Sequence, residues 1–286
     1  MKKILVTGAN GQLGQCLQKI SSQFEEFEFI FTDSETLDIT NKEEVNDFFW
    51  QNAPDFCINA AAYTAVDLAE TDIEKAFLVN ADGTENLAEA CAENNAQFIH
   101  VSTDYVFDGE NNLAYTEEDF TNPLGVYGAS KLAGDELALE VNPCSVILRT
   151  SWVYSEFGKN FVKTMLNLFA TKEELSIVAD QFGQPTNAND LAEAIMKIIK
   201  SEKITPGIFN FSNLGRISWF DFAEKIAELS EAKIKLNAIE TSQYPTPAKR
   251  PKNSVLDLDK ISKTYAIQLK PWEESLEGCV QILQNN

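Results

Sequence analysis

Residues 3–14 read "KILVTGANGQLG" and decide the fold class. A short apolar run leads directly into Gly8, Gly11 and Gly14, and a helical pattern follows. In such a strand–turn–helix unit, glycines allow a sharp turn, let backbone N–H groups approach a pyrophosphate and let the helix pack closely on the sheet. The spacing places Asn10 where the commoner motif has glycine. A dinucleotide-binding turn is predicted; the alternative is a glycine turn without a ligand.

The next predicted strand, "FEFIFTD" at residues 27–33, ends on an acidic residue. Asp33 follows the glycine turn by about 20 residues, the position from which a carboxylate contacts the adenosine ribose hydroxyls. A carboxylate there favours NAD over NADP because it repels a 2′-phosphate, although Asp33 could equally cap a turn. Asp38 and Ile39 are predicted to flank the adenine.

Apolar strand patterns alternate with helical patterns through the first half of the chain, which indicates a parallel sheet covered by helices on both faces. We expect a doubly wound, Rossmann-like α/β fold. Residues 1–150 are predicted to form the dinucleotide-binding domain. Residues 151–286, where the alternation loosens, are predicted to form a smaller, mainly substrate-binding domain, with segments such as 207–212 returning to the main sheet. Ser218 is a predicted helix N-cap.

Composition narrows the class of partner. The 286 residues carry 23 Lys plus Arg against 44 Asp plus Glu, a formal net charge of −21. Such a field repels phosphate backbones and anionic lipid, so neither nucleic acid nor a membrane is an expected partner. No apolar run approaches membrane-spanning length, and the first residues lack a signal-peptide pattern. The five widely spaced cysteines are expected to be buried thiols in a cytoplasmic protein, without disulfides or a zinc site.

Residues 126–131, "VYGASK", place Tyr127 and Lys131 one helical turn apart. Side chains at i and i+4 share a helix face, so the phenol and the ammonium can point into one cleft. An ammonium stabilises a phenolate and so lowers the pKa of a tyrosine that moves a proton. The alternative is an ordinary surface pair. Of seven tyrosines, only Tyr127 has a lysine four residues later.

Hydroxyl groups end the predicted fourth strand, "AQFIHVS", which continues into "TDYVFDG". Ser102 and Thr103 fall at the carboxyl edge of the sheet, where doubly wound folds bind ligands. A hydroxyl there can hold a substrate oxygen while Tyr127 supplies the proton. His100, the only histidine, is interpreted as a core residue. The residues alone thus predict a nicotinamide-dependent reductase of a carbonyl group.

Seven segments in order along the chain, from "TGANGQLG" through "STDYVFDG" and "YGASKLAGDE" to "YPTPAKRPKNSVLD", resemble the extended short-chain dehydrogenase/reductases, and within them the reductases of dTDP-linked keto-sugars. The resemblance runs from residue 4 to about residue 258. It implies reduction of the 4-keto group of dTDP-4-dehydro-L-rhamnose to dTDP-L-rhamnose with NADPH or NADH.

By motif position, the resemblance implies that Tyr127 is the catalytic acid, Lys131 its cationic partner and Thr103 the active-site hydroxyl. The implied sugar contacts are Asp104, Tyr105 and Trp152. The full set implied for the cofactor is Gly8, Asn10, Gly11, Gln12, Leu13, Gly14, Asp33, Asp38, Ile39, Ala61, Ala62, Tyr63, Val101, Tyr127 and Lys131.

One family feature is expected to be missing. Some members hold Mg²⁺ at a dimer interface with glutamates, one of them just after the glycine turn. Gln15 stands at this position, and a neutral amide is a weaker ligand for a hard cation. We therefore predict no metal site. The protein is expected to be a monomer or a homodimer.

A basic cluster interrupts the acidic chain at "AKRPK", residues 248–252. Arg250 is a candidate partner for the diphosphate of a nucleotide sugar. The alternative is a solvated basic loop, and the sequence favours neither.

Two other functions remain open at this point. A 4-epimerase or 4,6-dehydratase of nucleotide sugars would share the fold, but dehydratases need a second carboxylate where this chain has Tyr105 after Asp104. A non-catalytic partner resembling the regulatory subunit of methionine adenosyltransferase is the second. The intact Thr103, Tyr127 and Lys131 argue against lost catalysis.

Overall fold

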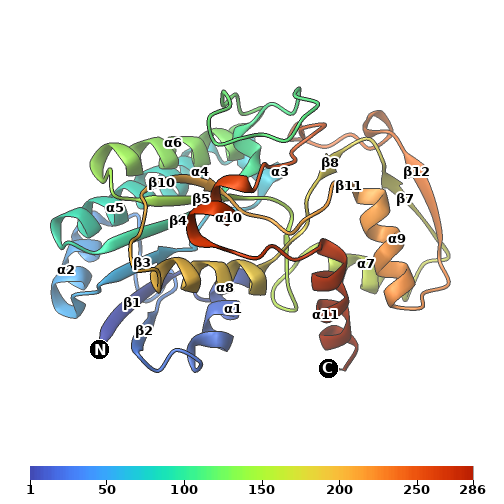
Figure 1. Ribbon diagram of the computed structural model, residues 1–286. Helices are drawn as coiled ribbons and strands as arrows, with labels where there is room; N and C mark the ends of the chain where they lie inside the picture. The colour runs from blue at the N-terminus through green and yellow to red at the C-terminus, as the bar shows by residue number, and fades with distance from the viewer. Residues whose placement is uncertain (286) are drawn as a thin grey trace.

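In the computed structural model, which describes residues 1–285, the predicted strands of the first half form one parallel sheet (Figure 1). Its six strands lie in the order β10-β5-β4-β3-β1-β2. Their bounds are β1 Lys2–Thr7, β2 Phe27–Phe31, β3 Phe56–Asn59, β4 Gln97–Thr103, β5 Val146–Thr150 and β10 Gly207–Asn210. The strand order reverses between β1 and β3, the position where doubly wound sheets bind nucleotides. The predicted fold class is confirmed, as is the return of residues 207–210 to the sheet.

Helices cover both faces of this sheet, as a buried parallel sheet requires (Figure 1). On one face, α5 packs between α2 and α6; on the other, α1 packs on α8. The bounds are α1 Gln12–Ser21, α2 Lys42–Asn52, α5 Gly83–Glu93, α6 Val126–Val141 and α8 Ala188–Ile199. The short α3 (Val66–Ala69) and α4 (Ile73–Phe77) precede α5, and a π-helical turn at Leu78–Asp82 joins α4 to it.

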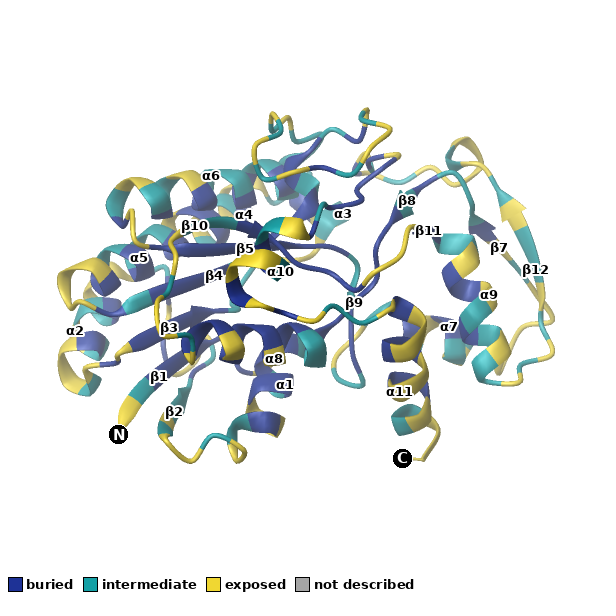
Figure 2. Cartoon of the chain, in the orientation of Figure 1, coloured by how far each residue is buried: buried dark blue, intermediate teal, exposed yellow. Residues whose placement is uncertain are grey.

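Each face has its own apolar core. Ile4 and Val6 face α1 and α8, whereas Leu5 and Cys57 face α2 and α5, as the alternation of side chains along a strand dictates. In Figure 2, β1, β3, β4 and β5 are buried along most of their length, and exposed residues lie on the outer faces of the helices.

Most of the remaining elements gather beyond the carboxyl edge of the sheet, whereas α10 (Asp259–Tyr265) packs on β10 of the sheet itself (Figure 1). A second core joins α7, α9 and α11 to a two-stranded parallel ribbon of β7 and β12. The bounds are β6 Val153–Tyr154, α7 Phe161–Phe169, β7 Glu174–Val178, β8 Phe182–Gly183, β9 Thr186–Asn187, β11 Ile217–Ser218, α9 Trp219–Leu229, β12 Lys235–Ile239, α10 Asp259–Tyr265 and α11 Trp272–Asn285. Ser218 caps α9 as predicted, accepting from Asp221 N at 3.1 Å.

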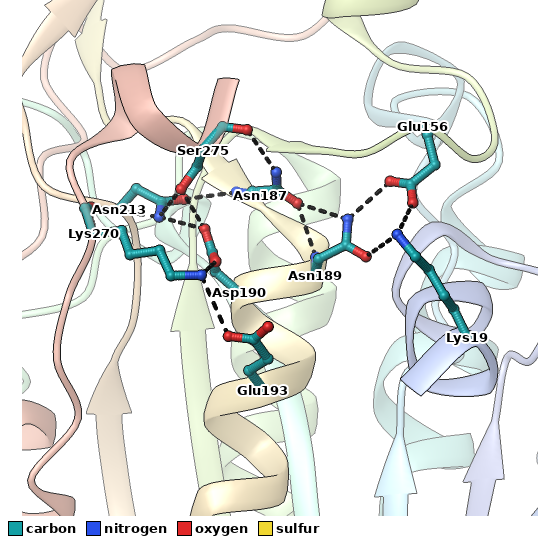
Figure 3. A network of polar contacts seen from close by, with 9 residues as sticks. All are labelled: Lys19, Glu156, Asn187, Asn189, Asp190, Glu193, Asn213, Lys270 and Ser275. Atoms are coloured by element: carbon teal, nitrogen blue, oxygen red, sulfur yellow. Dashed lines mark hydrogen bonds and ion pairs between the residues drawn. The ribbon is translucent and has the colours of Figure 1, made fainter. Parts of the chain in front are cut away.

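A polar network ties this second core to the helices α1 and α8 (Figure 3). Lys19 on α1 pairs with Glu156 at 2.6 Å, and Asn189 on α8 donates to the same carboxylate. The next residue of α8, Asp190, pairs with Lys270 at 2.6 Å and accepts from Asn213 Nδ2 at 2.8 Å. These contacts fix the position of the second core against the sheet.

The cysteines agree with the sequence in all but one case. All five are unpaired, and four are buried, but Cys144 is exposed because it lies in the turn before β5. The expectation of five buried thiols was wrong at this position. No helix within residues 1–285 is both long and apolar enough to cross a bilayer.

Substitution of Gly134 tests the close packing of α6 against the π-helical turn at Leu78–Asp82. A Cβ at this position would lie 2.1 Å from the carbonyl oxygen of Asn80. We expect Gly134→Ala to lower the melting temperature, although alanine favours helix by about 1 kcal/mol over glycine. The matched control is Gly278→Ala in α11, where a Cβ would have no neighbour within 4 Å, and which should leave the melting temperature unchanged or raise it. An unchanged melting temperature in Gly134→Ala would contradict this packing.

Candidate functional site

A cleft of about 1030 Å³ opens at the carboxyl ends of β1, β3, β4 and β5. It brings together most residues that the sequence assigned to cofactor or sugar. Those that line it are Gly8, Asn10, Gly11, Gln12, Leu13, Asp33, Asp38, Ile39, Ala61, Ala62, Val101, Thr103, Asp104, Tyr105, Tyr127, Lys131 and Trp152. Gly14, Tyr63 and Arg250 are not among its lining residues.

The glycine turn has the geometry of an anion cradle. Gly8 has φ +69°, and a Cβ there would lie 2.6 Å from the backbone N of Ala61, so only glycine fits. Gly14 packs α1 against the turn, since its Cβ would lie 2.4 Å from the carbonyl oxygen of Gly8. α1 begins after Gly11, which has no side chain to cap the first N–H groups. These donors face the cleft and fit a pyrophosphate.

Gln12 has a further role that the sequence did not predict. Its Oε1 accepts from Ser155 Oγ at 3.0 Å and from Asn160 Nδ2 at 2.8 Å, and its Nε2 donates to Val153 O at 3.3 Å. The glycine turn is thereby linked to residues 153–160 of the second half. These partners lie more than a hundred positions away, so no local pattern could have indicated the link.

Asp33 lies at the far end of the cleft and is exposed to solvent on one side. Its Oδ2 accepts from Asn10 Nδ2 at 2.7 Å and its Oδ1 from Thr36 Oγ1 at 2.9 Å. The hydrogen bond from Thr36 is the main reason that its pKa lies below the usual range. Asp33 is therefore ionised and held in place. The position of the Asp38 carboxylate is fixed by a hydrogen bond from Thr40 Oγ1 to its Oδ1 at 2.7 Å.

The three residues expected to carry the chemistry meet at the inner end of the cleft. Thr103 is the last residue of β4, and its hydroxyl donates to Asp104 Oδ1 at 3.1 Å. Tyr127 lies in the first turn of α6 and packs edge-on against Tyr105, with ring centroids 5.5 Å apart. Lys131 is buried one turn further along α6.

The pKa of the Tyr127 phenol is raised to about 12, mainly by burial and further by the carboxylates of Asp104 and Asp135, while the neighbouring Thr103 acts in the opposite sense. The predicted lowering by Lys131 is therefore not found; the partners of Lys131 Nζ are Val101 O at 2.8 Å and His100 Nε2 at 3.0 Å. The phenol is consequently protonated at neutral pH.

Asp104 and Trp152 face the cleft from different elements. Asp104 is 2% exposed, its Oδ2 has no hydrogen-bond partner within residues 1–285, and burial raises its pKa to about 6. Such an unpartnered buried oxygen fits a donor on a ligand. Trp152 has φ +48° and stacks on Trp219 with centroids 3.6 Å apart. Trp219 also lines the cleft, although the sequence gave no sign of a role for it there.

The remaining predicted residues have partners elsewhere. Arg250 forms a two-pronged ion pair with Asp67 on α3, with N–O distances of 2.9 and 2.8 Å. Tyr63 donates its hydroxyl to Asp72 Oδ2 at 3.1 Å. Gln15 uses its amide to donate to Asn10 O at 2.9 Å. No group of three metal-ligating side chains occurs in the described part of the chain.

Comparison with known proteins agrees with this geometry. A family model described as "RmlD substrate binding domain" matches residues 1–285. A dTDP-4-dehydrorhamnose reductase of Aggregatibacter actinomycetemcomitans is 45% identical over 97% of this chain and 98% of its own length.

Two solved structures extend the match to the whole fold. A dTDP-4-dehydrorhamnose reductase of Clostridium acetobutylicum is 43% identical, with a TM-score of 0.94 and 99% coverage of both chains. That of Bacillus anthracis, in complex with NADP, is 39% identical, with a TM-score of 0.95 over 99% of this chain and all of its own. The chain therefore belongs to the RmlD family of short-chain dehydrogenase/reductase-like proteins, together with the dTDP-4-dehydrorhamnose reductases.

Proposed function

We propose that this chain reduces the 4-keto group of dTDP-4-dehydro-L-rhamnose to dTDP-L-rhamnose with NADPH or NADH, as a cytoplasmic enzyme of dTDP-rhamnose biosynthesis. The observation that carries the proposal is the placement of Thr103, Tyr127 and Lys131 in one cleft with the glycine turn. The family relationship supports the same reaction, because full-length relatives bear its name.

The cleft fits a dinucleotide. The turn at Gly8 and the first N–H groups of α1 would hold the pyrophosphate, and Asp33 would accept from the adenosine ribose hydroxyls. Asp38, Ile39, Ala61, Ala62 and Val101 would line the path between the adenine and the nicotinamide, with Tyr63 behind them. When bound, the reduced nicotinamide supplies the hydride.

Tyr127 is the proposed proton donor. Its raised pKa keeps the phenol protonated at neutral pH, so it can give a proton to the oxygen that gains charge as the carbonyl is reduced. The hydroxyl of Thr103 would hold that oxygen in line with the phenol. Lys131, on the same helix face as Tyr127, would place a positive charge beside the phenolate that forms.

The sugar would lie between the two halves of the chain. Asp104, Tyr105 and Trp152 are its proposed contacts, and Arg250 is the proposed contact for the diphosphate if it leaves Asp67. Residues 1–150 would then hold mainly the dinucleotide and residues 151–286 mainly the sugar. We propose that no metal takes part and that the protein acts as a monomer or a homodimer.

Tyr127→Phe tests the proton donor. We expect NADPH to bind within about threefold of the wild-type affinity, and turnover of dTDP-4-dehydro-L-rhamnose to fall by about 10²–10⁴, the usual contribution of a positioned acid. Absorbance of the reduced nicotinamide follows the reaction. The matched control is Tyr244→Phe at an exposed site, which should keep full activity. Turnover by Tyr127→Phe near the wild-type rate would refute the role of the phenol.

Asp33→Ala tests the adenosine end of the cleft. Removal of the carboxylate should raise the ratio of kcat/KM for NADPH to that for NADH by about tenfold, because a repulsion worth about 1.4 kcal/mol at the 2′-phosphate is lost. Asp47→Ala, which removes an exposed carboxylate on α2, is the control of equal charge. An unchanged ratio in Asp33→Ala would exclude Asp33 from the ribose site.

A further inference from the structure

His100 is the only histidine of the chain, and the proposed reaction gives it no role. It is fully buried on β4, next to Lys131. Its Nδ1 lies 3.1 Å from Asn59 Nδ2, and its Nε2 lies 3.0 Å from Lys131 Nζ. Because each ring nitrogen of neutral imidazole is either a donor or an acceptor, these neighbours decide which nitrogen carries the proton.

The orientation of the Asn59 amide is fixed by its other partners. Its Oδ1 accepts from the backbone N–H of Ala61 at 3.1 Å and from Thr7 Oγ1 at 2.8 Å. Its Nδ2 also donates to Thr84 Oγ1, whose own proton goes to Asn80 O. A backbone N–H can only donate, so the amide oxygen must face Ala61. The amide nitrogen therefore faces the histidine ring and donates to it.

This orientation determines the state of the next contact. His100 Nδ1 is an acceptor, so the proton of the neutral ring is on Nε2 and points at Lys131 Nζ. An ammonium has donors only and would oppose this N–H. A neutral amine has a lone pair that accepts it, while one amine proton goes to Val101 O at 2.8 Å. The contact is a hydrogen bond only when Lys131 is uncharged.

The charges around this pair allow Lys131 to titrate. The Lys131 Nζ contacts His100 on β4, and the nearest carboxylate is Asp135 on α6, whose Oδ1 lies 3.8 Å from His100 Nε2. Arg149 on β5 pairs with Asp135 at 3.3 Å, and Tyr127 lies one turn before Lys131 on α6. Burial lowers the pKa of Lys131 to about 8, with Asp135 acting in the opposite sense. Burial and then Lys131 hold the pKa of His100 well below its usual value. The amine, not the imidazole, therefore changes charge near neutral pH.

We propose that His100 is a positioning residue that receives the neutral amine of Lys131, and that protonation releases this amine from the imidazole toward Tyr127 and the ribose side of the cleft. The role of the released ammonium beside Tyr127 rests on the proposed function. The contact between His100 and the neutral amine of Lys131 does not depend on the sugar substrate. Binding of the cofactor then takes up one proton above about pH 8, the pKa of Lys131.

Nitrogen NMR of the single histidine tests the pairing without cofactor. In protein labelled with ¹⁵N-histidine, we expect one imidazole in the Nε2–H tautomer from about pH 6 to about pH 10, with a change in the Nε2 shift near pH 8. Lys131→Met should keep the tautomer and lose the change. An imidazolium, an Nδ1–H tautomer, or the same inflection in Lys131→Met would overturn the proposal.

The affinity for NADPH, measured by nicotinamide fluorescence at several pH values, tests whether cofactor binding is coupled to protonation of Lys131. For the wild type, Kd should rise by up to about tenfold per pH unit above about pH 8, because one proton is taken up on binding. His100→Gln offers an amide oxygen to the ammonium and should move the inflection upward by about one pH unit. The matched control is Phe98→Leu, which alters the ring that stacks on His100 and should leave the inflection in place.

An inflection in His100→Gln equal to that of the wild type would overturn the positioning role. If His100→Gln does not fold, the comparison of wild type with Lys131→Met by NMR still decides the pairing. If NADPH binding shows the linkage but the keto-sugar is not reduced, the proposed function fails and the positioning role stands.

Discussion

The parallel register of β1, β3, β4 and β5 is the constraint on which the site depends. Thr7 lies opposite Asn59, Asn59 opposite His100, and Thr103 opposite Thr150, so the carboxyl ends of these strands meet at one edge. The glycine turn leaves this edge from β1, and the hydroxyl of Thr103 leaves it from β4. α6 then crosses the edge with Tyr127 in its first turn. A slip of one residue in any pair would turn the opposite face of a strand to the cleft.

Below this edge, hydrogen bonds run across the sheet from the glycine turn to α6. This series of hydrogen bonds links Thr7 to Asn59, Asn59 to His100 and His100 to Lys131. The two atoms of each bond are at most 3.1 Å apart. Buried polar groups of this kind are costly unless all are paired, and paired groups hold one arrangement firmly. The network therefore positions Lys131 relative to the turn that would hold the cofactor phosphates.

The sequence predicted what depends on local pattern. The apolar strands, the glycine turn, the cap at Ser218 and the helix carrying Tyr127 and Lys131 all follow from short-range periodicity or spacing, and the structure confirms them. Contacts between distant residues were not predictable in this way. The pairing of Arg250 with Asp67, the stacking of Trp219 on Trp152 and the link from Gln12 to residues 153–160 depend on the packing of the second half. The pKa of Tyr127 was predicted in the wrong direction because burial of the phenol outweighs the neighbouring lysine.

In the proposed complex, the Tyr127 hydroxyl meets the oxygen on C4 of the sugar beside the nicotinamide. A crystal structure of the protein with NADP and dTDP-L-rhamnose tests it most directly. We expect the Tyr127 Oη to lie within about 3 Å of the oxygen on C4 of the sugar, which is hydrogen-bond distance. A hydroxyl that instead faces solvent, or lies away from both the sugar and the nicotinamide, would contradict it.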